Sequence, residues 1–176
     1  KKINDNVGLP IIIYNIPSRS VIDMSVDTMS KLYELKNIIG VKDATGDLNR
    51  ADQQLKSMGK DFLQLTGEDG NALEFNKRGG SGCISVTANV AARLCSEFQT
   101  ASLSFGDQKK QTKAKEINSM LTPLHKALFI ESNPSPVKYA ASLLKLSSED
   151  VRLPLVKIRE ETKILVKEAL KVAKLL

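Results

Sequence analysis

The sequence predicts an α/β protein, with a parallel sheet in the first part of the chain and helices alone in the second. The first observation is that four apolar, β-branched runs alternate with four helical segments between residues 10 and 106. Strand–helix units that repeat in this way are typical of a parallel sheet with right-handed crossovers. The second observation is that only helical periodicity follows Gly106. We therefore expect an α/β part at 1–106 and a helical part at 107–176.

The strand–helix units are expected in the following order. Residues 10–17 are a β-branched run between two prolines, which predicts a strand buried on both faces. Residues 25–28 (Ser-Val-Asp-Thr) then give the start of a helix that extends to about Lys36. Three further strands are expected at 37–46, 62–67 and 82–88, and three further helices at 47–58, 71–75 and 91–104. In the second part, Asp107 caps a long amphipathic helix, and two more helices are expected at 137–146 and about 155–174.

Composition excludes some classes of partner. The 176 residues are 41% hydrophobic and 26% charged, as in an ordinary globular domain. The net charge of +6 comes from lysines spread among glutamates, and aromatic residues are only 5%, so we expect no nucleic acid partner. No apolar run reaches the length of a membrane span, which predicts no membrane partner. Two cysteines without metal or redox spacing favour a reducing, cytoplasmic setting.

A lysine within the apolar run at 37–46 is the first candidate for chemistry. Desolvating an ammonium is costly, and an amine held in apolar surroundings is a nucleophile toward carbonyl carbons. If the even-numbered face is interior in both strands, Lys42 and Tyr14 converge near the strand ends where α/β folds bind ligands. Tyr14 then suits a proton shuttle, and Gly40 leaves room for a small ligand. The pattern leaves a second interpretation equally open, with a snorkelling lysine and a half-buried tyrosine.

Other candidates are weaker. Arg19 follows the first strand and suits a substrate carboxylate, although spacing alone favours an exposed loop arginine. The loops at 44–47 and 67–70 match no phosphate-binding pattern, and the two acids of the second loop have no histidine nearby to complete a metal site. The single histidine, His125, lies within an amphipathic helix and is interpreted as structural. These observations argue against triad chemistry and favour the amine.

Four segments resemble one enzyme family when they are taken together and in order. They are 14–20 (Tyr-Asn-Ile-Pro-Ser-Arg-Ser), 40–46 (Gly-Val-Lys-Asp-Ala-Thr-Gly), 66–69 (Thr-Gly-Glu-Asp) and 82–89 (Gly-Cys-Ile-Ser-Val-Thr-Ala-Asn). They resemble the dihydrodipicolinate synthases, which are pyruvate-dependent class I aldolases. The resemblance implies that the four strands are strands five to eight of a (β/α)8 TIM barrel, followed by a C-terminal helical domain. It also implies that the first half of the barrel is absent, and we expect a fragment.

The resemblance further implies a Schiff-base lyase of lysine (diaminopimelate) biosynthesis, which condenses pyruvate with aspartate 4-semialdehyde to 4-hydroxy-tetrahydrodipicolinate. Lys42 would be the Schiff-base lysine and Tyr14 the proton-relaying tyrosine. Arg19 would receive the carboxylate of the semialdehyde, and Gly67 and Ile84 would line the pyruvate pocket. No cofactor or metal is implied, and the full-length family implies a homotetramer, a dimer of dimers. Two alternatives stay open: another 2-keto acid aldolase of the family, such as one similar to N-acetylneuraminate lyase, and a non-catalytic fragment.

Overall fold

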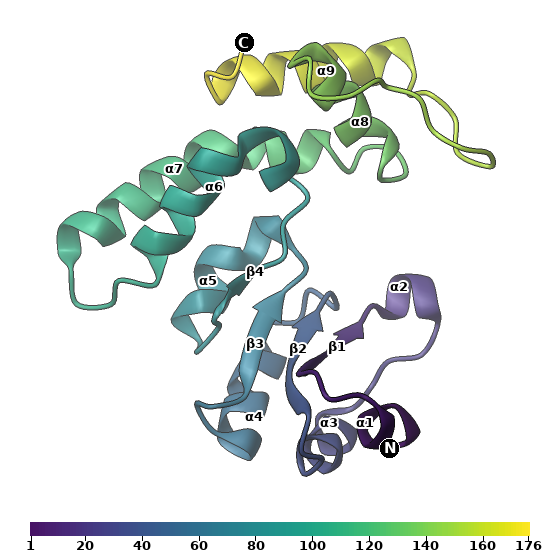
Figure 1. Cartoon of the computed structure of the whole chain (residues 1–176). Helices are drawn as coiled ribbons and strands as arrows, with labels where there is room; N and C mark the ends of the chain where they lie inside the picture. The colour runs from purple at the N-terminus through teal and green to yellow at the C-terminus, as the bar shows by residue number, and fades with distance from the viewer. The chain divides into compact units, whose positions relative to one another are not determined.

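A computed structural model describes all residues from 1 to 176 (Figure 1). The chain divides into two compact units, which we name the sheet unit (Lys1–Ile84) and the helical unit (Ser85–Leu176). The predicted boundary near Gly106 separates a barrel part from a C-terminal helical domain, which is a different division from these two units. Gly106 lies inside the helical unit, and the division at this residue stays a prediction.

Four parallel strands form the sheet of the sheet unit, in the order β1-β2-β3-β4 (Figure 1). Their bounds are β1 (Ile11–Asn15), β2 (Ile38–Asp43), β3 (Leu63–Thr66) and β4 (Gly82–Cys83). Because the strands are parallel, all four carboxyl ends lie at one edge of the sheet. The predicted parallel sheet is confirmed. The fourth strand is much shorter than predicted, because only its two residues pair with β3.

Helix α1 (Lys2–Asn6) precedes the first strand. The strands are connected by α2 (Pro17–Ser20), α3 (Val26–Tyr33), α4 (Asn49–Met58), the 3-10 turn η1 (Asp69–Asn71) and α5 (Ala72–Lys77). Helix α3 begins within the predicted start at 25–28, where Ser25 is the cap, since its side chain accepts a hydrogen bond from the Thr28 backbone N–H at 3.1 Å. Helix α4 ends at Gly59, whose φ of 78° is accessible to glycine at little cost.

One face of the sheet carries the core of the sheet unit. Val41 of β2 packs with Met29 of α3 and with Phe62, and all three are almost completely buried. Ile13 of β1 packs against the same cluster. The odd-numbered residues of β1 and β2 therefore point toward the helices.

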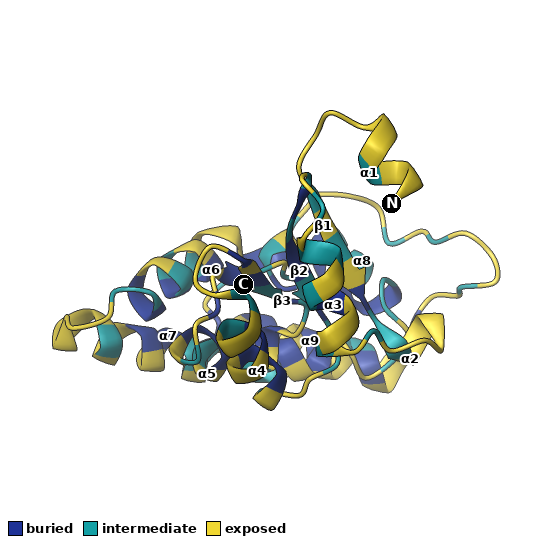
Figure 2. Cartoon of the chain, turned by 90° about the horizontal axis from the view of Figure 1, so that it is seen from below, coloured by how far each residue is buried: buried dark blue, intermediate teal, exposed yellow.

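The opposite face, which carries the even-numbered residues of β1, is open along β1. Ile12 is 39% exposed and Tyr14 is 50% exposed. The prediction that this strand is buried on both faces is wrong here, because helices of this chain cover only the odd-numbered face of β1. Helix α1, which has no buried residue, is also exposed in Figure 2.

The helical unit consists of α6 (Ala88–Ser102), α7 (Gln108–Ala127), α8 (Ser135–Leu143) and α9 (Glu160–Val172). Helix α7 packs against both α6 and α9, and α8 also contacts both of them. Leu121 and Leu124 of α7 and Leu170 of α9 are completely buried at its centre. Asp107 caps α7 as predicted, because its carboxylate accepts a hydrogen bond from the Lys110 backbone N–H at 3.1 Å. None of the helices in the chain combines the length and the apolar character needed to cross a bilayer.

Candidate active site

Tyr14 and Lys42 lie side by side near the carboxyl ends of neighbouring strands. They are paired in the register of β1 and β2, and the Lys42 Nζ lies 4.0 Å from the centroid of the Tyr14 ring. An ammonium over the face of an aromatic ring is attracted by the quadrupole of the ring. Lys42 is partly buried, whereas Tyr14 is half exposed on the open face of the sheet. The prediction from strand parity, that the two side chains share a face, is confirmed.

Gly67 provides the space through which the Lys42 side chain extends. A Cβ at Gly67 would lie 3.1 Å from Lys42 Cε and 2.9 Å from the Cβ of Ala44, both closer than ordinary contact. The Gly67 N–H donates a 2.7 Å hydrogen bond to the Asp43 carbonyl, which holds the turn after β3 against the end of β2. Gly67 therefore borders the amine directly.

Gly40 has a different role from the one predicted. A Cβ at Gly40 would lie 2.3 Å from the Leu63 carbonyl oxygen and 2.7 Å from the Leu63 Cβ. The space beside Gly40 is therefore occupied by the neighbouring strand β3. The prediction that Gly40 leaves room for a small ligand is wrong, because this glycine permits close approach of the two backbones.

The two remaining predicted residues follow β1 and β4 at the same edge of the sheet. Arg19 lies in α2, the single turn of helix that begins two residues after β1, and it is exposed. Ile84 directly follows β4, and its N–H donates a 2.9 Å hydrogen bond to the Thr66 carbonyl. The Ile84 side chain is 44% exposed. The structure thus brings all five predicted residues to the carboxyl edge of one sheet, which is where α/β folds bind ligands.

The comparisons with known proteins decide the family. A sequence model of the dihydrodipicolinate synthetase family matches residues 1–173. The chain belongs to this family. The resemblance read from the four sequence segments is confirmed, and so is the predicted fold class, an α/β fold that forms part of a TIM barrel.

Individual members of the family are closely similar. The chain is 64% identical over 176 residues to the 4-hydroxy-tetrahydrodipicolinate synthase of Pelagibacter ubique (strain HTCC1062), covering all of this chain and 60% of that protein. Among solved structures, the dihydrodipicolinate synthase of Aquifex aeolicus has a TM-score of 0.92 at 39% identity, over 99% of this chain and 59% of that one. The chloride-inhibited synthase of Acinetobacter baumannii, complexed with pyruvate, has a TM-score of 0.93 at 38% identity, with the same coverage. The chain thus spans about 60% of the length of these family members.

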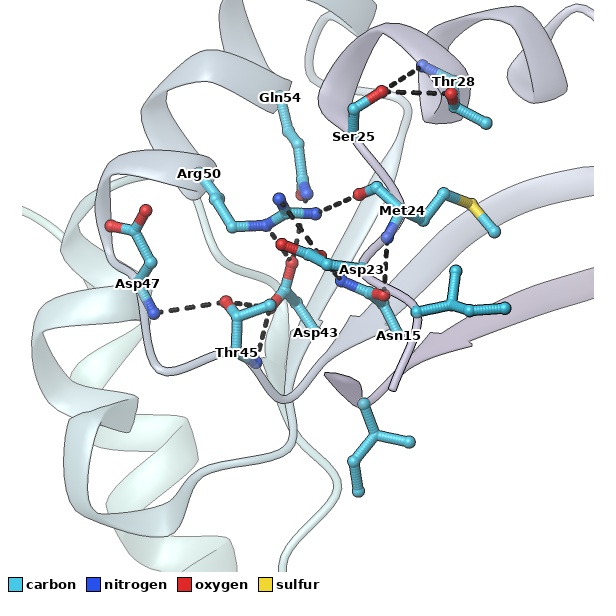
Figure 3. A network of polar contacts seen from close by, with 12 residues as sticks. Asn15, Asp23, Met24, Ser25, Thr28, Asp43, Thr45, Asp47, Arg50 and Gln54 are labelled. Carbon is cyan, nitrogen blue, oxygen red and sulfur yellow. Dashed lines mark hydrogen bonds and ion pairs between the residues drawn. The ribbon is translucent and has the colours of Figure 1, made fainter. Parts of the chain in front are cut away.

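A buried polar network lies on the other side of the same strand ends, and sequence reasoning missed it (Figure 3). Its centre is the ion pair between Asp43 of β2 and Arg50 of α4, with 2.9 Å between Asp43 Oδ2 and Arg50 Nε. Asp43 is 5% exposed and Arg50 is 8% exposed. The one signal in the sequence was an aspartate directly after the lysine in an otherwise apolar run. Its partner lies seven residues away, across a turn, and could not be identified from spacing.

The loops considered as phosphate or metal sites have structural partners. The Thr45 hydroxyl and backbone N–H both donate to Asp43 Oδ1, and the Thr45 hydroxyl oxygen accepts from the Asp47 N–H. These bonds shape the turn between β2 and α4. No group of three or more His, Cys, Asp or Glu residues in the chain is arranged to hold a metal ion. His125 is buried, and its Nδ1 lies 2.7 Å from the Thr87 hydroxyl, in agreement with a structural role.

Proposed function

We propose that the protein to which this chain belongs is a 4-hydroxy-tetrahydrodipicolinate synthase, a lyase of lysine (diaminopimelate) biosynthesis that condenses pyruvate with aspartate 4-semialdehyde. The single observation that carries the proposal is the lysine amine held 4.0 Å from a tyrosine ring at the carboxyl edge of a parallel sheet. The names of the relatives support the same activity, and one similar structure is of a synthase complexed with pyruvate.

The amine of Lys42 would begin the reaction by attacking the keto carbon of pyruvate. The carbinolamine that forms loses water to give an imine, so that one proton leaves the nitrogen and another reaches the departing hydroxyl group. We assign the transfer of both protons to the Tyr14 phenol, the titratable group whose ring lies beside the amine. Loss of a proton from the pyruvate methyl group then gives the enamine, a carbon nucleophile.

The enamine would next add to the aldehyde carbon of aspartate semialdehyde. The amino group of that substrate then attacks the imine carbon, which closes the ring and releases the Lys42 amine unchanged. We assign Arg19 to the carboxylate of the semialdehyde, because a guanidinium binds a carboxylate through two parallel hydrogen bonds. We assign Gly67 and Ile84 to the pyruvate pocket, Ile84 through its main chain. Every step uses groups of the protein and of the substrates.

The open face of the sheet supports a longer functional protein. Tyr14 is half exposed on this face, whereas catalysis by a Schiff-base lysine benefits from a site that excludes water. The family members extend well beyond the region that matches this chain. We propose that the remainder of the protein covers this face, that the complete protein assembles as a homotetramer built from dimers, and that it acts in the cytoplasm, where its two cysteines remain reduced.

The test uses a hybrid synthase, in which this chain replaces the matching 176 residues of the Pelagibacter ubique relative. The hybrid is incubated with pyruvate and reduced with borohydride, and its peptides are analysed by mass spectrometry. The proposal predicts a reduced pyruvate adduct on Lys42 and turnover with aspartate semialdehyde. Lys42→Ala should abolish both, whereas Lys60→Ala, which removes an exposed lysine from the same unit, should leave both unchanged. A folded hybrid without an adduct on Lys42, or one that cleaves sugar acids instead, would refute the proposal.

A further inference from the structure

The two residues that directly follow Tyr14 and Lys42 point to the other face of the sheet and are buried there. Asn15 is 3% exposed and Asp43 is 5% exposed, and the two are paired in the register of β1 and β2. Successive side chains of a strand point to opposite faces, so a constraint on Asn15 or Asp43 also orients the residue before it. The network in Figure 3 holds both of these side chains.

The Asp43 carboxylate uses both of its oxygens. Oδ1 accepts from the Thr45 N–H at 2.9 Å and from the Thr45 hydroxyl at 2.6 Å. Oδ2 accepts from Arg50 Nε at 2.9 Å and from Gln54 Nε2 at 3.3 Å. A carboxylate with four donors around it has little freedom to rotate. The end of β2 is thereby fastened to its own following turn and to helix α4.

Arg50 continues the network to β1. Its Nη2 donates a 2.6 Å hydrogen bond to the Met24 carbonyl, and its Nη1 lies 3.6 Å from Asp23 Oδ1. Asn15 meets the same two residues, because its Nδ2 donates to Asp23 Oδ1 at 2.9 Å and its Oδ1 accepts from the Met24 N–H at 3.1 Å. The guanidinium therefore connects the end of β2 to the end of β1 through two residues of one loop.

The relative offset of these two strands is not uniform. The pairing shifts by one residue between two adjacent pairs, Ile11 with Ile38 and Ile12 with Gly40. Without that shift, Tyr14 would be paired with Val41, which is buried on the helix-covered face, and Lys42 would be paired with Asn15. A slip of one residue reverses the face to which a strand's side chains point. The shifted register is thus the one that places Tyr14 beside Lys42.

We propose that Asp43 and Arg50 are positioning residues, which hold β1 and β2 in the register that keeps Tyr14 beside Lys42. This inference rests on the proposed function of Lys42. A buried ion pair is weak evidence for stability, because desolvation of the two charges offsets their attraction. Asp43 directly follows Lys42, and Arg50 contacts the Met24 carbonyl and Asp23, which also hold Asn15, the residue after Tyr14. The pair therefore has a second consequence, the position of the amine relative to the phenol.

The test compares a buried pair with an exposed one in the hybrid synthase. Asp43→Asn keeps the size of the side chain and removes its charge. Asp52→Asn is the matched control, because Asp52 pairs with Arg78 on the surface of the same unit. Steady-state rates and the rate of borohydride-trapped adduct formation on Lys42 are measured well below the melting temperature of each variant. Circular dichroism confirms that each variant is folded.

We expect Asp43→Asn to lower kcat and the trapping rate by roughly 10- to 100-fold, because displacement of a reacting group by about 1 Å has an effect of this size. The KM for pyruvate should change by less than about 3-fold, since no group that binds pyruvate is removed. Adding Arg50→Met to Asp43→Asn should cost little more, because the two residues act as a unit. The control should keep its rates.

Three results would overturn the inference. The first is an unchanged kcat in folded Asp43→Asn. The second is a decrease in kcat no larger than that of Asp52→Asn. The third is a decrease in kcat that the fraction of unfolded protein explains by itself. If Asp43→Asn does not fold, the same rates are measured for Arg50→Lys. This variant keeps the positive charge and loses the simultaneous contacts of the guanidinium with the Met24 carbonyl and Asp43, so the same decrease in kcat is expected. Failure of the parent hybrid to form any adduct would instead refute the proposed function.

Discussion

Replacement of Gly67 by alanine is the most local way to disturb the proposed amine. The new Cβ would lie 2.9 Å from Ala44 Cβ and 3.1 Å from Lys42 Cε. Carbon atoms that are not bonded pack at about 3.5 to 4.0 Å, so the two distances are roughly 0.6 Å and 0.4 Å too short. Ala44 is held by its backbone, since its N–H donates to the Asn15 carbonyl at 2.9 Å. The flexible Lys42 side chain can swing away, but the contact with Ala44 is relieved only if the turn after β3 also shifts.

We expect an effect on stability and an effect on chemistry. Overpacking by one methyl group costs about 1 to 3 kcal/mol, and the contact with the backbone-held Ala44 places the cost toward the upper part of this range. Displacement of the amine by a few tenths of an ångström from the Tyr14 phenol should slow imine formation by roughly 10-fold. The variant should thus remain folded and form its pyruvate adduct slowly.

The assay is the rate of borohydride trapping on Lys42 in the hybrid synthase, measured with the free energy of unfolding of the same samples. Gly70→Ala is the matched control, because a Cβ there would meet only the Glu68 Oε1, at 3.6 Å. We expect the control to keep the trapping rate of the parent. Equal trapping rates for Gly67→Ala and the parent would refute the steric argument, and so would equal losses in Gly67→Ala and the control.

Two further predictions concern a proton and a helix cap. Tyr14→Phe keeps the ring beside the Lys42 amine and removes the hydroxyl, so we expect trapping to slow by roughly 100-fold with the stability unchanged; an unchanged trapping rate would contradict the proton relay. Glu131 accepts a 3.0 Å hydrogen bond from the Arg159 N–H at the start of α9, and hydrogen bonds from the Thr162 side chain and this backbone lower the pKa of the carboxyl below 4.5. A lowered pKa stabilises the fold above the unfolded value and loses this effect as the pH falls through the folded value, so the Tm difference between the parent and Glu131→Gln should be present at about pH 7 and shrink below about pH 4.5. A Tm difference that stays constant down to about pH 3 would contradict this account.

Much of the sheet unit could be predicted from local pattern. Serine is typical at the start of a helix and glycine at its end. In the structure Ser25 begins α3 and Gly59 ends α4. The alternation of side chains along β1 and β2 was enough to place Tyr14 beside Lys42. In each case the information lies within a few residues of the feature that it determines.

Features that depend on distant segments were missed or misjudged. The exposure of Tyr14 depends on which element covers the face, and no pattern within the strand reports that. Gly40 was predicted to leave room for a ligand. The residue that fills this space is Leu63 of another strand, and the sequence around Gly40 does not indicate it. The pair of Asp43 and Arg50 needs the turn after β2 to fold before the two charges meet. Recognition of the family supplied site roles, but it did not indicate this pair.

The most direct measurement of the central claim is the mass spectrum of the hybrid synthase after incubation with pyruvate and borohydride. The account predicts one modified peptide, with the reduced pyruvate adduct on Lys42, and predicts that Lys42→Ala removes it. An adduct on another lysine, or a folded protein that stays unmodified, would contradict the claim that this strand lysine is the nucleophile.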